Sequence, residues 1–128
     1  RSQWKKIGEN QFFLDAYNAN PTSMRKGLEA FAAMEGKTKV AILGDMLEMG
    51  DYSQREHTEI AQLASSMNFD HLILVGPEFA KVDPASNRIS FTKFDQLRTW
   101  YDGQKFQGAT VFLKGSRGIG LERLIGEK

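Results

Sequence analysis

Short apolar runs alternate along the chain with segments in which apolar residues recur every three or four positions. The runs at 39–43 and 71–75 are apolar on both faces, which is typical of strands buried within a parallel sheet. A glycine turn at 8–10 favours antiparallel pairing of residues 3–7 with the run at 11–14. The complete set of predicted strands is 3–7, 11–14, 39–43, 71–75, 89–91 and 110–113.

The segments between these strands are predicted to be helices. Asn20 and Pro21 suit the cap and the first position of a helix, whose apolar face then extends as far as Gly36. Ser53 and Glu56 have the spacing of a capping box at the start of a second helix. Further helical segments are predicted at 77–81, 94–101 and 119–125.

This alternation indicates an α/β fold with an open, mostly parallel sheet, helices on both faces and an antiparallel N-terminal edge strand. The length of 128 residues fits a single domain spanning 1–128. The chain begins at Arg1 rather than at a methionine. We therefore expect it to be a piece of a longer protein, with part of the chemistry on other segments.

Composition narrows the classes of function. The absence of cysteine excludes a disulfide-stapled scaffold, a Cys-ligated metal site and a thiol enzyme, and makes the cytoplasm the expected compartment. Seventeen Lys and Arg against sixteen Asp and Glu give a net charge of +1, too balanced for non-specific nucleic-acid binding. The apolar runs are far shorter than the roughly 20 residues that span a bilayer, so no transmembrane helix or signal peptide is expected.

Three polar loops directly follow predicted strands, at 15–21, 44–50 and 114–118. Ligands of open α/β sheets bind outside the carboxyl ends of the strands, and in a parallel sheet these ends share one edge. We therefore expect the three loops to meet. This convergence is the main evidence for a site that the residue pattern itself provides.

The first loop carries an acid, a phenol and two amides, at Asp15, Tyr17, Asn18 and Asn20. It leads into a helix N-terminus, where free backbone N–H groups favour an anion or a sugar hydroxyl, so it suits a nucleotide. The alternative is that Asp15 and Asn18 only satisfy the backbone of the turn while Asn20 only caps the helix.

The second loop contains Asp45, Glu48 and Asp51, with His57 on the helix behind it. Carboxylates with a histidine can bind Mg²⁺ or Mn²⁺, or act as acid and base. The alternative is that the acids are solvated loop charges and that His57 packs or hydrogen-bonds on its own helix.

The third loop combines Lys114, Ser116 and Arg117 with glycines between a strand and a helix, which is the chemistry of a carboxylate cradle. The alternative is a glycine turn with two exposed cations. Lys114 precedes Gly115, so the order differs from the phosphate-binding pattern G-x-x-x-x-G-K-[ST]. No nucleophile elbow surrounds Ser116, which argues against a serine hydrolase.

Three blocks follow one another in order: Asp-Ala-Tyr-Asn-Ala-Asn-Pro-Thr-Ser-Met at 15–24, Leu-Gly-Asp-Met-Leu-Glu-Met-Gly at 43–50 with Ser53 and His57, and Leu-Lys-Gly-Ser-Arg-Gly at 113–118. Together they resemble the carboxy-terminal domain of the Mur ligase family, in the branch that uses D-alanyl-D-alanine. The resemblance covers nearly the whole chain and implies a Rossmann-like fold.

The resemblance also implies an ATP-dependent ligase of three domains, active in peptidoglycan precursor synthesis. Such an enzyme joins D-alanyl-D-alanine to UDP-N-acetylmuramoyl-tripeptide through an acyl phosphate, with Mg²⁺ assisting. The N-terminal domain holds the UDP-sugar, the central domain supplies the P-loop and most Mg²⁺ ligands, and the last domain closes the site. This chain corresponds to the last domain, so alone it is expected to be inactive. A cytoplasmic monomer without nucleic-acid or membrane partners is expected.

Carried over by resemblance, Arg1 corresponds to an arginine at the domain junction that reaches ATP. Asp15 corresponds to the acid that contacts the ribose, and Tyr17, Asn18 and Asn20 complete the expected nucleotide-binding loop.

The other two blocks carry the remaining candidates. Lys114, Ser116 and Arg117 correspond to the loop that holds the incoming dipeptide, where a cation can pair with its carboxylate. The candidate site residues of the second block, which the resemblance leaves without individual roles, are Asp45, Glu48 and His57.

Two questions stay open on the residues alone. The alternative function is a stand-alone Rossmann-like module that binds a nucleotide or anion without catalysis. Trp4 could pack on the edge of the sheet or face a neighbouring domain, whereas His71, which opens a buried strand, is expected to be structural.

Overall fold

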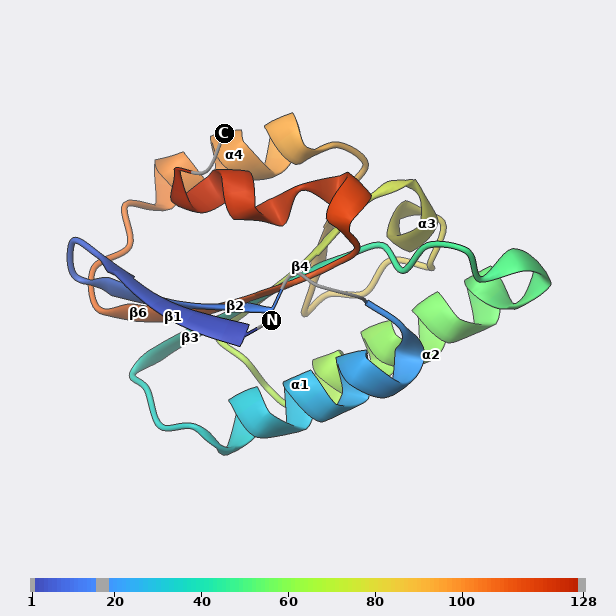
Figure 1. Ribbon diagram of the computed structural model, residues 1–128, viewed down its shortest axis with the longest axis horizontal. Coiled ribbons are helices and arrows are strands. Elements are labelled where there is room, and N and C mark those ends of the chain that lie inside the picture. Colours follow the sequence, from blue (N-terminus) through green and yellow to red (C-terminus); the bar gives the residue numbers. More distant parts are fainter. Residues whose placement is uncertain (1, 16–18, 127–128) are drawn as a thin grey trace.

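The computed structural model describes residues 2–15 and 19–126, which form a six-stranded sheet between layers of helices (Figure 1). The strand order is β1-β2-β6-β3-β4-β5. β1 pairs with β2 in antiparallel fashion, and every other neighbouring pair is parallel. The strands are β1 (Ser2–Ile7), β2 (Asn10–Asp15), β3 (Thr38–Gly44), β4 (His71–Val75), β5 (Ile89–Phe91) and β6 (Ala109–Lys114).

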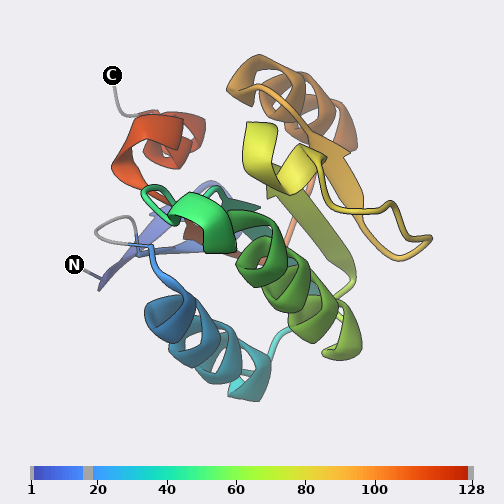
Figure 2. The same cartoon turned by 90° about the vertical axis from the view of Figure 1, so that its right-hand side faces the viewer.

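Helices α1 and α2 cover one face of this sheet, and α4 with the 3₁₀ segment η3 covers the other (Figures 1 and 2). The short helix α3 adds Phe79 to the core on the α1–α2 side. The bounds are α1 (Pro21–Ala33), η1 (Gly50–Tyr52), α2 (Ser53–Ser66), α3 (Pro77–Ala80), α4 (Phe94–Gln104), η2 (Arg117–Ile119) and η3 (Leu121–Ile125). This architecture confirms the predicted fold class.

The central strand β3 shows why both of its faces are apolar. Ala41 and Leu43 pack under α1 and α2, whereas Val40 and Ile42 belong to the core beneath α4 and η3. All four side chains have no exposed surface. Each face of the sheet thus buries its own hydrophobic core, and burial of apolar area on both sides is the main stabilising contribution to the domain.

Helix α1 begins where the sequence predicts. The Asn20 side-chain oxygen accepts a hydrogen bond from the Ser23 N–H at 2.9 Å, and the Ser23 hydroxyl accepts one from the Asn20 N–H at 3.1 Å. Pro21 occupies the first helical position, where a missing N–H costs nothing. The helix ends at Ala33, earlier than the predicted limit at Gly36.

Trp4 packs on the edge of the sheet. Its ring lies 5.0 Å from that of Phe13, which stacks at 5.9 Å on Phe112, and Phe112 stacks at 5.2 Å on Phe31 of α1. Trp4 nevertheless stays 51% exposed. Contact with the sheet edge is therefore confirmed, while a further contact with a neighbouring domain stays a prediction.

Two local predictions were wrong. Ser53 does not cap α2: it is the first residue of the helix, and its hydroxyl donates a 2.6 Å hydrogen bond to Glu78 Oε1 on α3 instead. The closing helix predicted at 119–125 is two 3₁₀ segments separated at Gly120, whose φ of +70° interrupts regular helix.

Candidate functional site

The three polar loops meet in one cleft at the carboxyl edge of the sheet, which confirms the predicted convergence. The cleft has a volume of about 610 Å³. Its lining comes from the loop after β2, the loop after β3 and the loop after β6. The residues are Ala19, Asn20, Leu47, Glu48, Ser116, Arg117 and Gly118.

The tips of β3 and β6 are held together by close backbone contact. A Cβ atom on Gly115 would lie 2.7 Å from the Gly44 Cα, so the position directly after β6 requires glycine, whereas a Cβ on Gly44 would lie 3.3 Å from the Gly115 Cα and be only tightly packed. The Ser116 N–H donates a 3.0 Å hydrogen bond to the Asp45 carbonyl oxygen. These contacts fix two walls of the cleft relative to each other.

Asp15 and Lys114 pair with each other at the carboxyl ends of β2 and β6, and neither lines the cleft. The Lys114 Nζ is 2.9 Å from Asp15 Oδ2, and the lysine is only 2% exposed. The lysine stem passes under Gly27 of α1, where a Cβ would lie 3.3 Å from its Cδ. The alternative that Lys114 is an exposed turn cation is therefore wrong: its charge is buried and paired. The Asp15 side chain keeps 21% of its surface exposed.

Asp45 is buried rather than solvated. Its carboxylate accepts hydrogen bonds from the backbone N–H groups of Glu78 at 2.8 Å and Phe79 at 2.9 Å, at the start of α3. It lies so close to Gly76 that a Cβ there would be 2.3 Å from the Asp45 Cγ. Burial raises the pKa of the Asp45 carboxyl, and the two backbone hydrogen bonds oppose this rise.

His57 anchors the loop after β3. Its Nε2 accepts a 3.0 Å hydrogen bond from the Met46 N–H, so the proton of a neutral ring lies on Nδ1 and is donated to the Ser53 carbonyl oxygen at 2.8 Å. The ring has no exposed surface, and its Nε2 is 4.0 Å from Asp45 Oδ1. The alternative that His57 hydrogen-bonds on its own helix is confirmed.

The second loop does not gather its acids into a metal site. Asp45 and His57 are buried, whereas Glu48 is exposed and lines the cleft. Within residues 2–15 and 19–126, no three His, Cys, Asp or Glu side chains come together in a way that could hold a metal ion. The metal-site interpretation of this loop thus finds no support.

The polar residues that line the cleft differ in how they are engaged. The Asn20 side-chain oxygen caps α1, as predicted by the alternative interpretation of the first loop, in which Asn20 serves as a helix cap. Ser116 is only 8% exposed, and its hydroxyl has no hydrogen-bond partner among the described residues. Glu48 has a left-handed backbone with a φ of +62°. Arg117 is exposed at the mouth. The remaining candidates, Arg1, Tyr17 and Asn18, lie outside the described residues.

Sequence analysis did not single out Leu47 or Glu78 as residues of the site. Leu47 lines the cleft although it is apolar, and Glu78 belongs to the network that anchors the loop. The dipeptide Gly76-Pro77 directly after β4 could have indicated Glu78, because it starts a helix on the same edge of the sheet. The hydrogen bond from Ser53 is the main reason that the pKa of Glu78 lies below its ordinary value.

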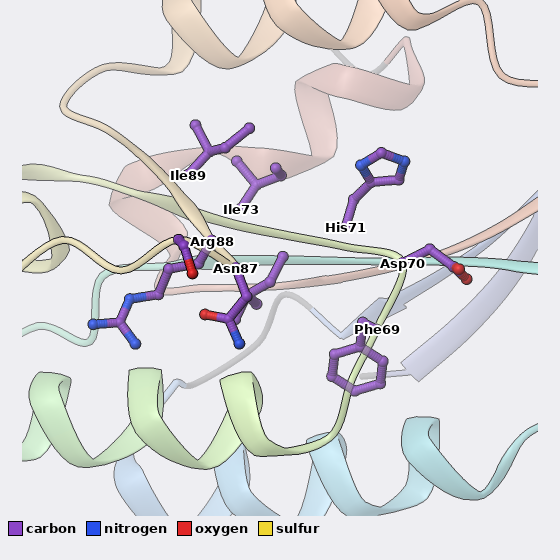
Figure 3. Close-up of a pocket in the computed structure, with 9 residues that line it drawn as sticks. Phe69, Asp70, His71, Ile73, Asn87, Arg88 and Ile89 are labelled. Carbon is purple, nitrogen blue, oxygen red and sulfur yellow. The ribbon is translucent and has the colours of Figure 1, made fainter.

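A second pocket, of about 210 Å³, lies near the amino ends of β4 and β5, away from the cleft (Figure 3). Polar side chains of this pocket make structural contacts: Asp70 accepts a hydrogen bond from the Lys39 N–H, and Arg88 donates to Ser65 and to the Asp83 carbonyl. The buried Arg88 Nε has no partner among the described residues. His71 packs edge-on against Trp100 and Phe106, as a structural histidine should. Because none of the three polar loops lines this pocket, we do not take it as the candidate site.

The fold and the cleft define a class: a Rossmann-like α/β domain whose ligand site lies at the carboxyl edge of its sheet. None of the helices formed by the described residues has the length and apolarity needed to cross a membrane. The family model described as Mur ligase, glutamate ligase domain, matches residues 1–117. The chain belongs to the Mur ligase family.

Individual relatives agree with this assignment. The chain is 36% identical over 120 residues to the UDP-N-acetylmuramoyl-tripeptide–D-alanyl-D-alanine ligase of Treponema pallidum, covering 88% of this chain and 26% of that protein. It is 30% identical over 125 residues to the ligase of the same name from Escherichia coli, covering 93% and 27%. The chain therefore spans about a quarter of the length of the curated relatives it matches.

Solved structures show the same fold. MurF from Acinetobacter baumannii superposes with a TM-score of 0.85 at 28% identity, over 96% of this chain and 28% of that one. The MurF ligase of Thermotoga maritima, solved in complex with ADP, gives a TM-score of 0.80 at 22% identity, over 95% and 28%.

Proposed function

We propose that this chain is the carboxy-terminal domain of an ATP-dependent ligase that joins D-alanyl-D-alanine to UDP-N-acetylmuramoyl-tripeptide through an acyl phosphate. The observation that carries the proposal is the meeting of the three motif-bearing loops in a single cleft. The names of the relatives support the reaction, and the match to about a quarter of their length supports the assignment to one domain of a longer enzyme.

The proposal divides the work among three domains of one polypeptide. The central domain binds most of the ATP and the Mg²⁺. The carboxy-terminal domain, which is the present chain, contributes further contacts to the nucleotide through Arg1, Asp15, Tyr17, Asn18 and Asn20. Asp15 fits this role because it keeps part of its carboxylate exposed while Lys114 balances its charge. A carboxylate held in this way accepts hydrogen bonds from ribose hydroxyls.

Ser116 and Arg117 are proposed to bind the carboxylate of the incoming dipeptide, because both line the cleft. Lys114 is buried, pairs with Asp15 and does not line the cleft, so it adds positive charge near the site without direct contact with the dipeptide. Closure of this domain onto the others excludes water and protects the acyl phosphate from hydrolysis. The enzyme is proposed to work as a cytoplasmic monomer.

The test uses the full-length protein with ATP, Mg²⁺, UDP-N-acetylmuramoyl-tripeptide and D-alanyl-D-alanine. The wild-type protein should form the amide and release phosphate. Arg117→Ala should raise the KM for the dipeptide about tenfold to a hundredfold, because a charge-assisted hydrogen bond is lost. The KM for ATP should stay unchanged.

Arg55→Ala is the matched control, since Arg55 is 63% exposed on α2 and outside the cleft lining. It should leave all three KM values unchanged. Absence of amide formation by the wild-type protein would overturn the proposed reaction. An Arg117→Ala variant that behaves like Arg55→Ala would overturn the carboxylate assignment alone.

A further inference from the structure

The cleft carries charges of opposite sign on two of its walls. Glu48 contributes a carboxylate from the loop after β3, and Arg117 contributes a guanidinium from the loop after β6. In the described part of the chain, no cation forms an ion pair with Glu48. A ligand that carries both a positive and a negative group would therefore meet a complementary charge on each wall.

The backbone holds Glu48 in a conformation that glutamate rarely adopts. Its φ of +62° lies in the left-handed region, which costs a residue with a Cβ free energy relative to glycine. The loop is nevertheless fixed on both sides of Glu48: Met46 donates to His57 at 3.0 Å, and the Met49 carbonyl accepts from the Tyr52 N–H at 3.1 Å. Backbone strain that a surrounding network maintains is a recurrent property of ligand-binding positions.

A second, independent observation points to a ligand in the same cleft. Ser116 is 8% exposed and lines the cleft, and its buried hydroxyl has no hydrogen-bond partner among residues 2–15 and 19–126. Buried hydroxyl groups are usually paired, so an unpaired one at a cleft wall is available to a partner from outside the domain.

We propose that Glu48 binds the primary ammonium group of the amine substrate, while Ser116 and Arg117 on the neighbouring loop take its carboxylate. The ligand class is a short zwitterionic peptide, and the inference rests on the proposed function. Glu48 thereby selects a substrate with a free amino terminus and places that nitrogen at a fixed point of the cleft. The proposed contact concerns the binding of the ammonium form of the substrate and not the formation of the new bond.

The experiment compares Glu48→Gln with the wild type in the full-length enzyme. Gln keeps the size of the side chain and removes its charge. The KM for D-alanyl-D-alanine should rise about tenfold or more, with kcat changed much less and the KM for ATP unchanged.

D-lactyl-D-alanine provides the specific readout, because a hydroxyl replaces the ammonium on the same skeleton. As a competitive inhibitor it should bind the Glu48→Gln variant and the wild type within about twofold, since the lost charge has no ammonium to attract in this ligand. Asp51→Asn is the control: it removes the same charge from an exposed position outside the cleft lining and should change neither constant.

The outcomes separate the two proposals. A wild-type enzyme that forms no amide from these substrates would remove the proposed function and this inference with it. An active wild type with a Glu48→Gln variant indistinguishable from Asp51→Asn would remove the inference alone. Equal weakening of the dipeptide and of D-lactyl-D-alanine would show that Glu48 only maintains the shape of the loop, and would also overturn the assignment.

Discussion

The contact between Gly44 and Gly115 allows a sharp test of the architecture beneath the cleft. A Cβ added at Gly115 would lie 2.7 Å from the Gly44 Cα and 2.9 Å from the Gly44 nitrogen. Both of these atoms belong to the backbone of a central strand, so neither can rotate away. Overpacking of this kind costs about 1–3 kcal/mol, and we expect Gly115→Ala to destabilise the domain by that amount.

Gly103 supplies a matched control for the same chemical change. It lies within α4, and a Cβ there would meet nothing within 4 Å. Gly→Ala in an unhindered helix stabilises by about 0.5–1 kcal/mol, because alanine loses less backbone entropy on folding. The two substitutions should therefore shift stability in opposite directions.

Urea unfolding of the 128-residue chain, followed by circular dichroism, measures the difference. The midpoint should fall for Gly115→Ala and rise for Gly103→Ala, with the slope m unchanged in both. If Gly115→Ala unfolds at the wild-type midpoint, the tips of β3 and β6 do not approach as described. The two cleft walls would then lack their fixed separation.

The remaining predictions concern titratable groups. Ser53→Ala removes the hydrogen bond that holds the pKa of Glu78 below its ordinary 4.5. A carboxyl with a lowered folded-state pKa stabilises the protein above its unfolded pKa and loses that contribution as pH falls through the folded value. The variant should therefore have a lower Tm at neutral pH and a shallower fall of Tm below about pH 4.5, measured by thermal scans; a parallel downward shift at every pH would contradict this. Tyr101→Phe should leave stability unchanged or raise it by up to about 1 kcal/mol, because the Tyr101 hydroxyl is buried without a partner among the described residues. Burial also raises the pKa of Tyr101 to about 12, so the wild type should lose stability as pH rises from its ordinary value of 10 towards 12, and the variant should lose less over the same range. Loss of more than about 1 kcal/mol on this substitution at neutral pH would show that the hydroxyl has a partner.

The sequence predicted those features that depend on residues close together in the chain. The start of α1 follows from Asn20, Pro21 and Ser23, which lie within one turn of each other. The buried character of β3 follows from consecutive apolar residues, and this placed the loops at one edge of the sheet. Convergence of the loops could thus be predicted without any knowledge of side-chain contacts.

Features that depend on distant residues could not be predicted in this way. Ser53 has the local pattern of a helix cap, but Glu78, 25 residues further on, takes its hydroxyl. Lys114 looks like an exposed turn cation until α1 covers it at Gly27 and Asp15 on the neighbouring strand pairs with it. Both outcomes are set by tertiary packing, which a reading of local sequence patterns does not include.

The polar residues at the rim serve two different purposes, although they are interleaved in the sequence. Asp45 and His57 are buried and hold the loop after β3 in place, whereas Glu48, in the same motif, faces the cleft. Loss of a buried residue such as Asp45 or His57 leaves hydrogen-bond donors or acceptors without partners, so it lowers the stability of the whole rim. Under the proposal made above, loss of a cleft-facing residue such as Glu48 leaves the fold intact and lowers ligand affinity. Residues of one motif can therefore act through two different mechanisms. Measurement of both Tm and KM for a variant at each position separates them.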